Sequence, residues 1–463
     1  MRVVVLGGGP GGYVCAIRAA QLGAKVTLIE KKHLGGTCLN VGCIPTKVLL
    51  HTAELYKVMK EEADSFGIGL DNLHVDWPKL QERKDMVIGQ LVGGVGTLLD
   101  TNNIRMVAGE GKFLDKSKIE VKLLDGGKEI IEFDKTVIAT GSSPVKVPIP
   151  GVELEGVITS DEALSLSQVP KSLCIIGGGV IGTEFASVYA SLGAEVTIVE
   201  MLPEILGNID SDIAACLKNK LMEDGVKIYT GTKVESIQKD GEKLKIHTTS
   251  NADSLFISAE KVLLSIGRKP AIDNIGLENL GIKKEKNRIL VDKRMKTNVE
   301  NIYAIGDCNG GILLAHVASA EGMIAAENMM GKSSKIDFKT VPSCIYTRPE
   351  LASVGLTEAE AKKQGYAVKT GVFPLYANGK SMIMGEGEGM VKFVVDAHND
   401  EILGLHMAGP RATDLIVEGA LAIRLEATID EIITTIHAHP TVGEAIHEAA
   451  HAVHGNAIHL PKI

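Results

Sequence analysis

Two stretches of the chain repeat one pattern of apolar and polar positions. Residues 3–30 read VVVLGGGPGGYVCAIRAAQLGAKVTLIE and residues 173–200 read LCIIGGGVIGTEFASVYASLGAEVTIVE; with a shift of 170 positions, 12 of 28 residues are identical. Each copy begins with an unbroken apolar run, continues in small residues and ends in a second apolar run closed by a glutamate. The pattern predicts strand, helix and strand in each copy, and therefore an α/β protein that uses one βαβ unit twice.

A glycine motif fills the turn between the first strand and the helix of each copy. The G-x-G-x-x-G positions and the acids that follow 18 residues later are Gly7, Gly9, Gly12 and Glu30 in the first copy, and Gly177, Gly179, Gly182 and Glu200 in the second. Such glycines allow a tight turn and close approach of the backbone to a pyrophosphate, which the helix N-terminus attracts. The acid is placed to accept from ribose hydroxyls. We therefore expect two dinucleotide sites, one for FAD and one for a nicotinamide.

The second acid also selects between the two nicotinamide cofactors. A carboxylate at Glu200 would bond a 2′-hydroxyl and repel a 2′-phosphate, and the residues after it supply no arginine. The sequence therefore favours NAD over NADP.

Two further strand ends are candidates for the first nucleotide site. Residues 135–142 read KTVIATGS and end in Thr140, Gly141 and Ser142, whereas residues 297–307 read TNVENIYAIGD and end in Asp307. A carboxylate at that strand end could bond a ribitol hydroxyl of FAD. We expect both segments to complete the first site.

A pair of cysteines five residues apart suggests redox chemistry. Residues 35–47 read GGTCLNVGCIPTK, which places Cys38 and Cys43 at the start of an expected helix, with Lys47 one turn further on. A helix N-terminus and a nearby cation both favour a thiolate. Two buried apolar cysteines are the alternative, and a zinc site would need a second ligand pair that the sequence lacks. We favour a redox-active disulfide.

Composition and charge narrow the class of protein. Glycine accounts for 51 of 463 residues and aromatic residues for 4%, which is typical of backbones that approach each other or a ligand closely. The net charge of −9, without a basic block, argues against a nucleic-acid partner. No apolar run reaches the ~18 residues of a membrane helix, and no signal peptide is expected. The seven scattered cysteines indicate a reducing compartment, either the cytoplasm or, for a matured form, the mitochondrial matrix.

Taken together, these motifs resemble the pyridine nucleotide–disulfide oxidoreductases over essentially the whole chain. The resemblance implies a homodimer with two Rossmann-like dinucleotide-binding domains and an α+β C-terminal dimerisation domain. The expected divisions are 1–142 for FAD, 143–268 for NAD, 269–338 as a central domain that completes the FAD site, and 339–463 for the dimer interface.

The resemblance also assigns roles to individual residues. It implies that Cys38 exchanges disulfides with the substrate, that Cys43 lies against the flavin, and that Lys47 pairs with Glu184 beside it. His439 in the segment HAHPTVGE would be the acid–base residue, oriented by Glu444 and reaching the other subunit's disulfide. The remaining cofactor contacts implied by the resemblance are Gly111, Val180, Ile181, Val234, Gly267, Arg268 and Ala315.

The activity implied by the resemblance is reoxidation of dihydrolipoamide to lipoamide with NAD⁺. The partners would be lipoyl-bearing proteins, either acyltransferase components of 2-oxo acid dehydrogenases or the carrier protein of glycine cleavage. A related reductase of glutathione or mercuric ion is the alternative within the class, and a non-catalytic flavin-binding protein is the alternative outside it.

The C-terminal segment carries one competing motif. His447, Glu448 and His451 fit the H-E-x-x-H pattern of zinc peptidases, with both imidazoles on one face of a helix. The segment is also a plain alanine-rich helix, and no other peptidase feature occurs in the chain. We therefore expect no metal centre here, although a histidine-rich tail could bind metal adventitiously.

Overall fold

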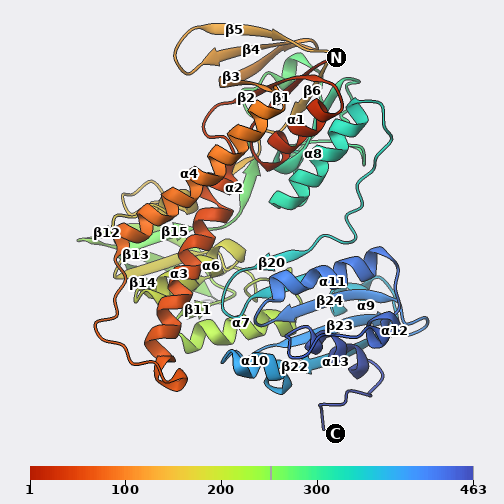
Figure 1. The fold of residues 1–463 in the computed structure, drawn as a ribbon. Coiled ribbons are helices and arrows are strands. Elements are labelled where there is room, and N and C mark those ends of the chain that lie inside the picture. Colours follow the sequence, from red (N-terminus) through yellow and green to blue (C-terminus); the bar gives the residue numbers. More distant parts are fainter. Residues whose placement is uncertain (251–252, 462–463) are drawn as a thin grey trace.

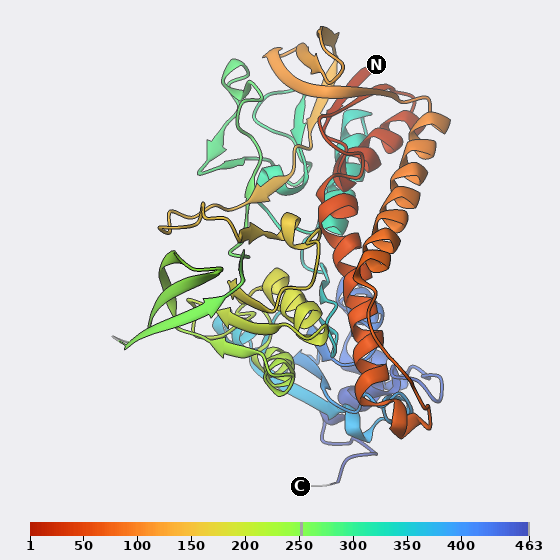
Figure 2. The same ribbon diagram turned by 90° about the vertical axis from the view of Figure 1, so that its left-hand side faces the viewer.

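The computed structural model describes residues 1–250 and 253–461, which form three connected bodies with the N-terminus at one end and the C-terminus at the other (Figures 1 and 2). The first body contains a sheet of seven strands. In spatial order they are β19 (Ile302–Ala304), β6 (Lys135–Ile138), β1 (Arg2–Leu6), β2 (Lys25–Glu30), β3 (Arg105–Asp115), β4 (Lys118–Leu123) and β5 (Lys128–Glu132). The pairs from β19 to β3 are parallel and those from β3 to β5 are antiparallel, so the expected βαβ unit lies at the centre.

Two helices that are far apart in the sequence pack closely beside this sheet. They are α1 (Pro10–Gln21) and α8 (Ala315–Met329), and their buried faces consist largely of alanine and glycine. A Cβ atom on Gly322 would lie 2.5 Å from the Gly11 carbonyl oxygen. The small residues noted in the sequence therefore serve a helix–helix contact too close for any larger side chain.

The second body repeats the parallel arrangement with fewer strands. Its order is β11 (Lys227–Tyr229), β10 (Glu195–Val199), β9 (Ser172–Ile176), β15 (Lys261–Leu264) and β8 (Val157–Thr159), all parallel. An antiparallel meander accompanies it, formed by β12 (Lys233–Asp240), β13 (Lys243–Ser250) and β14 (Asp253–Ala259). Helices α6 (Val180–Ser191) and α7 (Ser211–Glu223) belong to this body.

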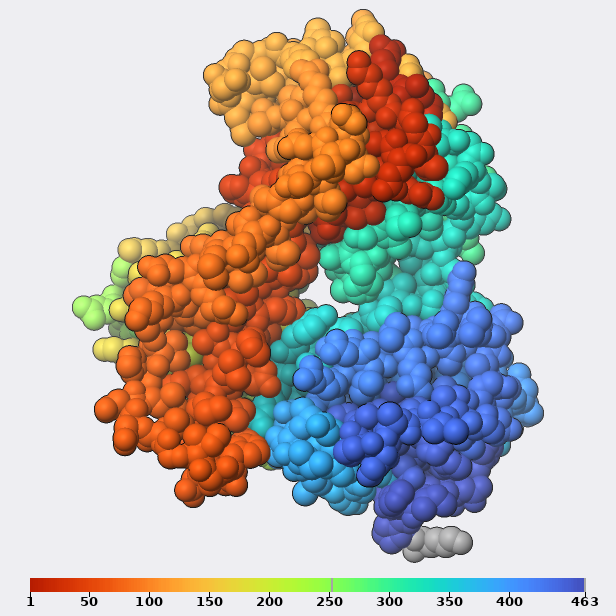
Figure 3. Space-filling model, in the orientation of Figure 1, coloured from red at the N-terminus to blue at the C-terminus, as the bar shows by residue number. Residues whose placement is uncertain are grey.

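A helical hairpin runs along the side of the molecule from the first body past the second (Figure 2). It follows the short helix α2 (Gly36–Val41) and consists of α3 (Cys43–Glu61) and α4 (Trp77–Thr101), the latter capped by the Asp76 side chain. Leu49 of α3, Trp77 of α4 and Phe185 of α6 share one hydrophobic cluster. This packing fixes the cysteine-bearing end of α3 relative to the second body. In the space-filling view, the lower end of the hairpin, in orange, lies directly against the C-terminal part of the chain (Figure 3), where Arg348 pairs with Glu62 at the end of α3.

The third body is an antiparallel sheet covered by helices. Its strands, in spatial order, are β20 (Ser343–Ile345), β21 (Leu351–Gly355), β24 (Ile402–Ala408), β23 (Met390–Asp396) and β22 (Val368–Pro374). Its helices are α9 (Glu358–Lys363), α10 (Gly379–Ile383), α11 (Ala412–Arg424), α12 (Ile429–Thr434) and α13 (Glu444–Ala452). Side chains of α11 and α13 share a core with Phe393 and Leu405 of the sheet.

Short elements complete the chain. They are α5 (Ser160–Ala163), the pair β7 (Ser142–Pro144) and β16 (Arg268–Pro270), the pair β17 (Lys284–Glu285) and β18 (Arg288–Ile289), and the 3₁₀ turns η1 (Ala63–Phe66), η2 (Leu277–Asn279), η3 (Gly306–Asn309) and η4 (Leu375–Ala377). Within the described ranges, no helix is long and apolar enough to cross a bilayer.

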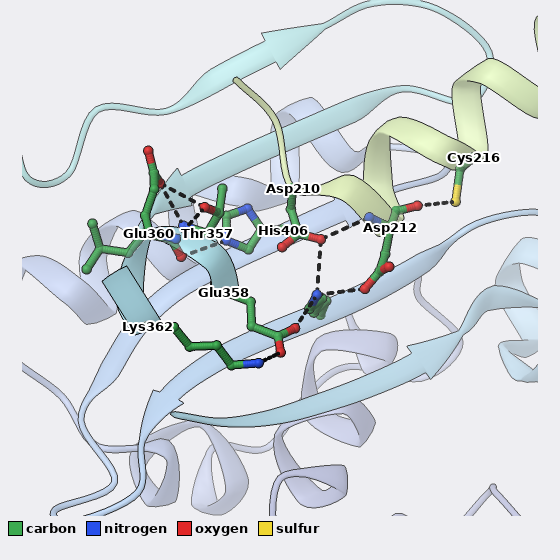
Figure 4. Close-up of polar contacts among 10 residues, drawn as sticks. Asp210, Asp212, Cys216, Thr357, Glu358, Glu360, Lys362 and His406 are labelled. Atoms are coloured by element: carbon green, nitrogen blue, oxygen red, sulfur yellow. Dashed lines mark hydrogen bonds and ion pairs between the residues drawn. The ribbon is translucent and has the colours of Figure 1, made fainter. Parts of the chain in front are cut away.

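A buried lysine joins the second and third bodies. Because neighbours on a strand point to opposite faces, Val391 and Phe393 enter the core of the third body while Lys392 faces the other way, toward α7. The Lys392 side chain is 3% exposed, and its Nζ lies 3.1 Å from Asp210, 2.6 Å from Asp212 and 2.8 Å from Glu358. The close-up shows these carboxylates converging from α7 and α9 (Figure 4).

The cross-strand neighbour of Lys392 adds no second cation. His406 is fully buried, and its Nε2 lies 2.9 Å from the Leu356 carbonyl oxygen. Burial lowers the pKa of His406, so the imidazole stays neutral. Lys392 is therefore the cation that compensates Asp210, whose side chain is also 3% exposed.

We expect Lys392→Met to lower the free energy of unfolding by about 3–5 kcal/mol, because it leaves the buried Asp210 carboxylate unpaired. The measurement is the urea midpoint of the purified protein. Lys362→Met is the matched control: Lys362 bonds the same Glu358 but its side chain is 60% exposed, so the loss should stay below about 1 kcal/mol. Equal losses in the two variants would contradict the buried-charge explanation.

Candidate active site

The two glycine turns have the same geometry in both copies. Gly7 has a φ of 112° and Gly177 a φ of 108°, and a Cβ atom on either would collide with the carbonyl oxygen of a neighbouring strand end, Ala139 or Ser265. A Cβ on Gly12 would lie 1.9 Å from the Gly7 carbonyl oxygen, and one on Gly182 would lie 2.0 Å from that of Gly177. The first and third glycines of each motif are thus required by backbone packing alone.

The middle glycine of each motif has a different role. Gly9 and Gly179 occupy the N-cap positions of α1 and α6, and around Gly179 a Cβ atom would meet nothing within 4 Å. Across residues 1–250 and 253–461, no side chain caps either helix, whereas α4, α7, α9 and α10 are capped by side chains. The free amides of α1 and α6 thus fit the pyrophosphate of a dinucleotide.

The glutamates at the strand ends brace these turns. Glu30 accepts from the Gly8 amide at 2.7 Å and from the Lys32 amide at 2.7 Å. Glu200 accepts in the same way from the Gly178 amide at 2.6 Å and from the Leu202 amide at 2.7 Å. Each carboxylate keeps further lone pairs for a ribose, and its orientation is already set by two backbone donors.

Two strand ends from other parts of the chain meet at the first turn. The Ser142 hydroxyl donates to Asp307 at 2.5 Å, and the Arg268 Nε donates to the same hydroxyl at 2.8 Å. The buried Thr140 hydroxyl has no hydrogen-bond partner among the described residues, and Gly141, with a φ of 70°, has open space beside it. A buried hydroxyl without a partner, next to a turn with open space, is the feature expected where a polar cofactor such as FAD binds.

The other expected contacts occupy more varied positions. Ala315 begins α8, Val180 and Ile181 begin α6, and Gly267 follows β15 with a φ of 115° and open space around it. Gly111 lies within β3, where a Cβ atom would be 2.6 Å from the Leu6 side chain. Val234 is buried on β12. The structure thus brings Gly267 to an open turn and gives Gly111 and Val234 packing roles of their own.

A buried carboxylate that the sequence did not single out supports the turn containing Asp307. Glu321 of α8 accepts from the Gly306 amide at 2.6 Å and from the Asn309 side chain at 2.9 Å. Burial, together with the charge of Asp307, raises the pKa of Glu321 to about 7. In the sequence, Glu321 stands out only as an acid within the largely apolar residues 310–326.

The two predicted redox cysteines face each other as thiols at a helix junction. Cys38 lies on α2 and Cys43 begins α3; Cys43 is the more exposed. The hydrogen bond from Cys38, with the Lys47 ammonium nearby, lowers the pKa of Cys43 to about 7, although burial opposes this. The same hydrogen bond and burial raise the pKa of Cys38. In the dithiol state the negative charge therefore belongs on Cys43.

The expected ion pair beside the thiols is formed. Lys47 Nζ lies 2.8 Å from each Glu184 carboxylate oxygen, and the Glu184 side chain is only 4% exposed. The bidentate contact ties α3 to α6.

His439 and Glu444 are oriented as a proton-transfer pair. Nδ1 of His439 lies 2.9 Å from one Glu444 carboxylate oxygen, and the Thr441 amide donates to the other at 2.9 Å. The imidazole is 80% exposed, so its Nε2 side is open to a partner. The start of α13, where Glu444 lies, is on the C-terminal body, well separated from α2 within this chain (Figure 1).

The histidines of the competing motif have other contacts. His447 and His451 stack edge to face with ring centroids 4.7 Å apart, and His447 Nε2 lies 2.9 Å from the Ile433 carbonyl oxygen. Glu448 accepts from the Ile458 and His459 amides at 2.9 and 3.1 Å. Across the residues described, no group of three or more potential ligands is arranged to hold a metal ion.

Comparison with known proteins agrees with this arrangement. The family model described as "Pyridine nucleotide-disulphide oxidoreductase" matches residues 1–322, and the model of that family's dimerisation domain matches residues 341–450. A dihydrolipoyl dehydrogenase of Bacillus subtilis is 46% identical, covering 99% of both chains; a mitochondrial dihydrolipoyl dehydrogenase of Arabidopsis thaliana is 41% identical, covering 99% of this chain and 91% of its own. The crystal structure of LpdA from Mycobacterium tuberculosis superposes with a TM-score of 0.91 at 29% identity, covering 97% of this chain and 99% of that one.

With two nucleotide turns, a dithiol and a dimerisation domain in place, the chain belongs to the pyridine nucleotide–disulphide oxidoreductases. Within this family, the proteins similar to it along their whole length include dihydrolipoyl dehydrogenases of bacterial and mitochondrial type.

The raised pKa of Glu321 has a consequence for stability. An unfolded glutamate loses its proton above about pH 4.3, whereas the folded carboxyl keeps it until about pH 7. The unfolded state therefore binds fewer protons in this window, and stability falls as the pH rises through it. We expect Glu321→Gln to gain thermal stability relative to the unsubstituted protein between pH 5 and pH 8, measured by calorimetry.

Glu327 on the same helix is the control. Hydrogen bonds from Ser334 and Arg18 lower the pKa of its carboxyl, so Glu327 is ionised in both the folded and the unfolded state above about pH 5, and the stability difference caused by Glu327→Gln should not change between pH 5 and pH 8. A pH-independent difference for Glu321→Gln would show that its proton is not held in the folded state.

Proposed function

We propose that the protein oxidises protein-bound dihydrolipoyl groups to lipoyl groups and reduces NAD⁺ to NADH. The observation that carries the proposal is the Cys38–Cys43 thiol pair placed between a nucleotide turn and the Lys47–Glu184 ion pair. Identity of 40–46% to dihydrolipoyl dehydrogenases over nearly the whole chain supports this substrate.

We assign a separate binding role to each part of the chain. Residues 1–142, completed by the central part 269–338, hold FAD at the Gly7 turn, with Thr140, Ser142 and Asp307 as further contacts. Residues 143–268 hold NAD at the Gly177 turn, and residues 339–463 form the dimer interface. When bound, FAD would supply the two-electron chemistry that links the dithiol to NAD⁺. The bracing of Glu200 by two amides, with no arginine following it, supports NAD rather than NADP.

The thiol chemistry starts from the Cys38–Cys43 disulfide of the resting enzyme. A substrate thiolate attacks Cys38, the Cys38–Cys43 bond breaks, and Cys43 leaves as a thiolate. The second substrate sulfur then attacks the first, which closes the lipoyl disulfide and releases Cys38. Two electrons and two protons have left the dithiol: the electrons are on the cysteine pair, and the protons pass to bases in the site. The lowered pKa of Cys43 makes it the better leaving group.

His439 is the base that prepares the attacking thiolate. Glu444 accepts at Nδ1, which leaves Nε2 to take the substrate proton. The separation between α13 and α2 within one chain supports action on the partner's disulfide (Figure 1). The dimerisation-domain match supports a homodimer, and Val417, Leu421 and Ile436 expose apolar side chains on the third body that pairing would cover.

We further propose lipoyl-bearing acyltransferase or glycine-cleavage carrier proteins as the partners. The relatives include a bacterial protein and a mitochondrial one, and we propose a bacterial cytoplasm or a mitochondrial matrix as the compartment. Both are reducing, and the seven scattered cysteines support such a compartment.

A steady-state assay tests the function directly. Purified protein should oxidise NADH with lipoamide at least 100-fold faster than it oxidises NADPH with glutathione disulfide. The reason is that Glu200 repels a 2′-phosphate, as argued above. Faster turnover with NADPH and glutathione disulfide would refute the proposal, as would protein that folds but takes up no FAD.

His439→Gln should lower dihydrolipoamide turnover by about 10²–10⁴-fold, the usual contribution of a general base. Flavin reduction by NADH should stay near the unsubstituted rate, because hydride transfer requires no thiol deprotonation. Stopped-flow absorbance separates these two half-reactions. A normal thiol half-reaction in the variant would exclude His439 as the base.

Two further experiments test whether the effect is specific to His439 and whether it acts across the dimer interface. His454→Gln, a histidine beyond α13 near Asp430, should leave both half-reactions unchanged. Dimers that combine His439→Gln chains with Cys43→Ser chains should regain one working site if the base acts across the interface. Stable mixed dimers without activity would place the base and the disulfide it serves in the same chain.

A further inference from the structure

One aromatic side chain of the third body lies against the ion pair beside the redox cysteines. Tyr346 directly follows β20, and its ring centroid lies 4.6 Å from Lys47 Nζ. Its backbone amide donates to Glu184 at 3.1 Å. Tyr346 therefore contacts both members of the pair, the cation through its ring and the carboxylate through its amide.

The ring rather than the hydroxyl makes the contact with the ammonium. Burial raises the pKa of the Tyr346 phenol to about 12, so the side chain is neutral. A neutral aromatic face attracts a cation through its quadrupole, and it does so more strongly when water is partly excluded. The Lys47 side chain is 30% exposed, so part of its hydration is already replaced by Glu184 and the ring.

Fixing this ammonium matters because a lysine has four rotatable bonds and could point elsewhere. The charged and titratable groups facing Cys43 are Cys38 from α2, Lys47 from its own helix, Glu184 from α6 and Tyr346 after β20. Lys47 stabilises a thiolate there, whereas Glu184 opposes it. The balance between these two charges depends on where the ammonium is held.

We propose that Tyr346 is a positioning residue that fixes the Lys47 ammonium beside Cys43 and thereby favours the Cys43 thiolate. The dimerisation part of the chain thus contributes to the chemistry of the dithiol from within the same subunit, independently of His439. The inference rests on the proposed redox role of Cys38 and Cys43.

The test uses the FAD-bound protein reduced by one equivalent of dihydrolipoamide and titrated with acid. A thiolate next to an oxidised flavin absorbs at wavelengths beyond the flavin's own band, and this absorbance disappears when the thiolate is protonated. Tyr346→Leu keeps the amide and an apolar side chain but removes the aromatic face. Its midpoint should move upward, corresponding to an increase of about three- to tenfold in the proton affinity of Cys43.

Two further variants separate positioning from general structural support. Tyr346→Phe keeps the ring and should retain the midpoint of the unsubstituted protein. In a Lys47→Met background, Tyr346→Leu should cause no additional shift, because its effect passes through Lys47. Thermal unfolding midpoints, measured alongside, show whether each variant is folded.

The outcomes distinguish this inference from the proposed function. Absence of the long-wavelength band in the unsubstituted protein would count against the proposed redox pair itself. A normal band with an unshifted, folded Tyr346→Leu variant would overturn the role of Tyr346 alone. A shift in Tyr346→Phe equal to that in Tyr346→Leu, or an additional shift in the Lys47→Met background, would also overturn it.

Discussion

The contact between Lys47 and Glu184 is the constraint around which the candidate site is arranged. Glu184 is almost completely buried, and a buried carboxylate is tolerated only when a cation and hydrogen-bond donors compensate it. Lys47 comes from α3, and the Tyr346 amide comes from the third body. Satisfying one carboxylate therefore requires segments separated by more than a hundred residues to meet at one point.

The surrounding packing is organised to make that meeting possible. Leu49 lies two residues after Lys47, Phe185 follows Glu184, and Ile345 precedes Tyr346; all three belong to the same hydrophobic cluster. Each polar group of the site is thus next in sequence, or nearly so, to a fully buried apolar side chain. Because close-packed interiors tolerate little displacement, these apolar neighbours fix the positions of Lys47, Glu184 and Tyr346 relative to one another. A second ionic contact, between Lys392 and the carboxylates of α7 and α9, joins the second and third bodies further away (Figure 4).

How far the sequence predicted the site depends on how local each signal was. The repeated glycine turns and the glutamates at the strand ends lie within short segments, so spacing alone placed them on the correct elements. Spacing also placed Cys43 correctly at a helix start, whereas Cys38 lies on the preceding helix α2. The pairs Lys47–Glu184 and His439–Glu444 came from resemblance, and the structure brings both together. Glu321, Tyr346 and Lys392 were missed because each acts on residues far away in the chain, and a lone acid, tyrosine or lysine has no distinctive spacing.

By itself, the sequence determined the repeated βαβ unit, because strand and helix periodicity and the need for glycine at positive φ are properties of neighbouring residues. It also predicted two thiols at the start of one helix, which was right for Cys43 at the start of α3 but wrong for Cys38, which lies on the separate helix α2. Only the tertiary structure decided which thiol holds the charge, since this depends on Lys47, Glu184 and burial acting together at Cys43. It likewise decided that Gly111 packs against Leu6 and that Glu321 keeps a proton near neutral pH. Desolvation and charge coupling arise from groups brought together by folding, and they have no counterpart in the order of residues along the chain.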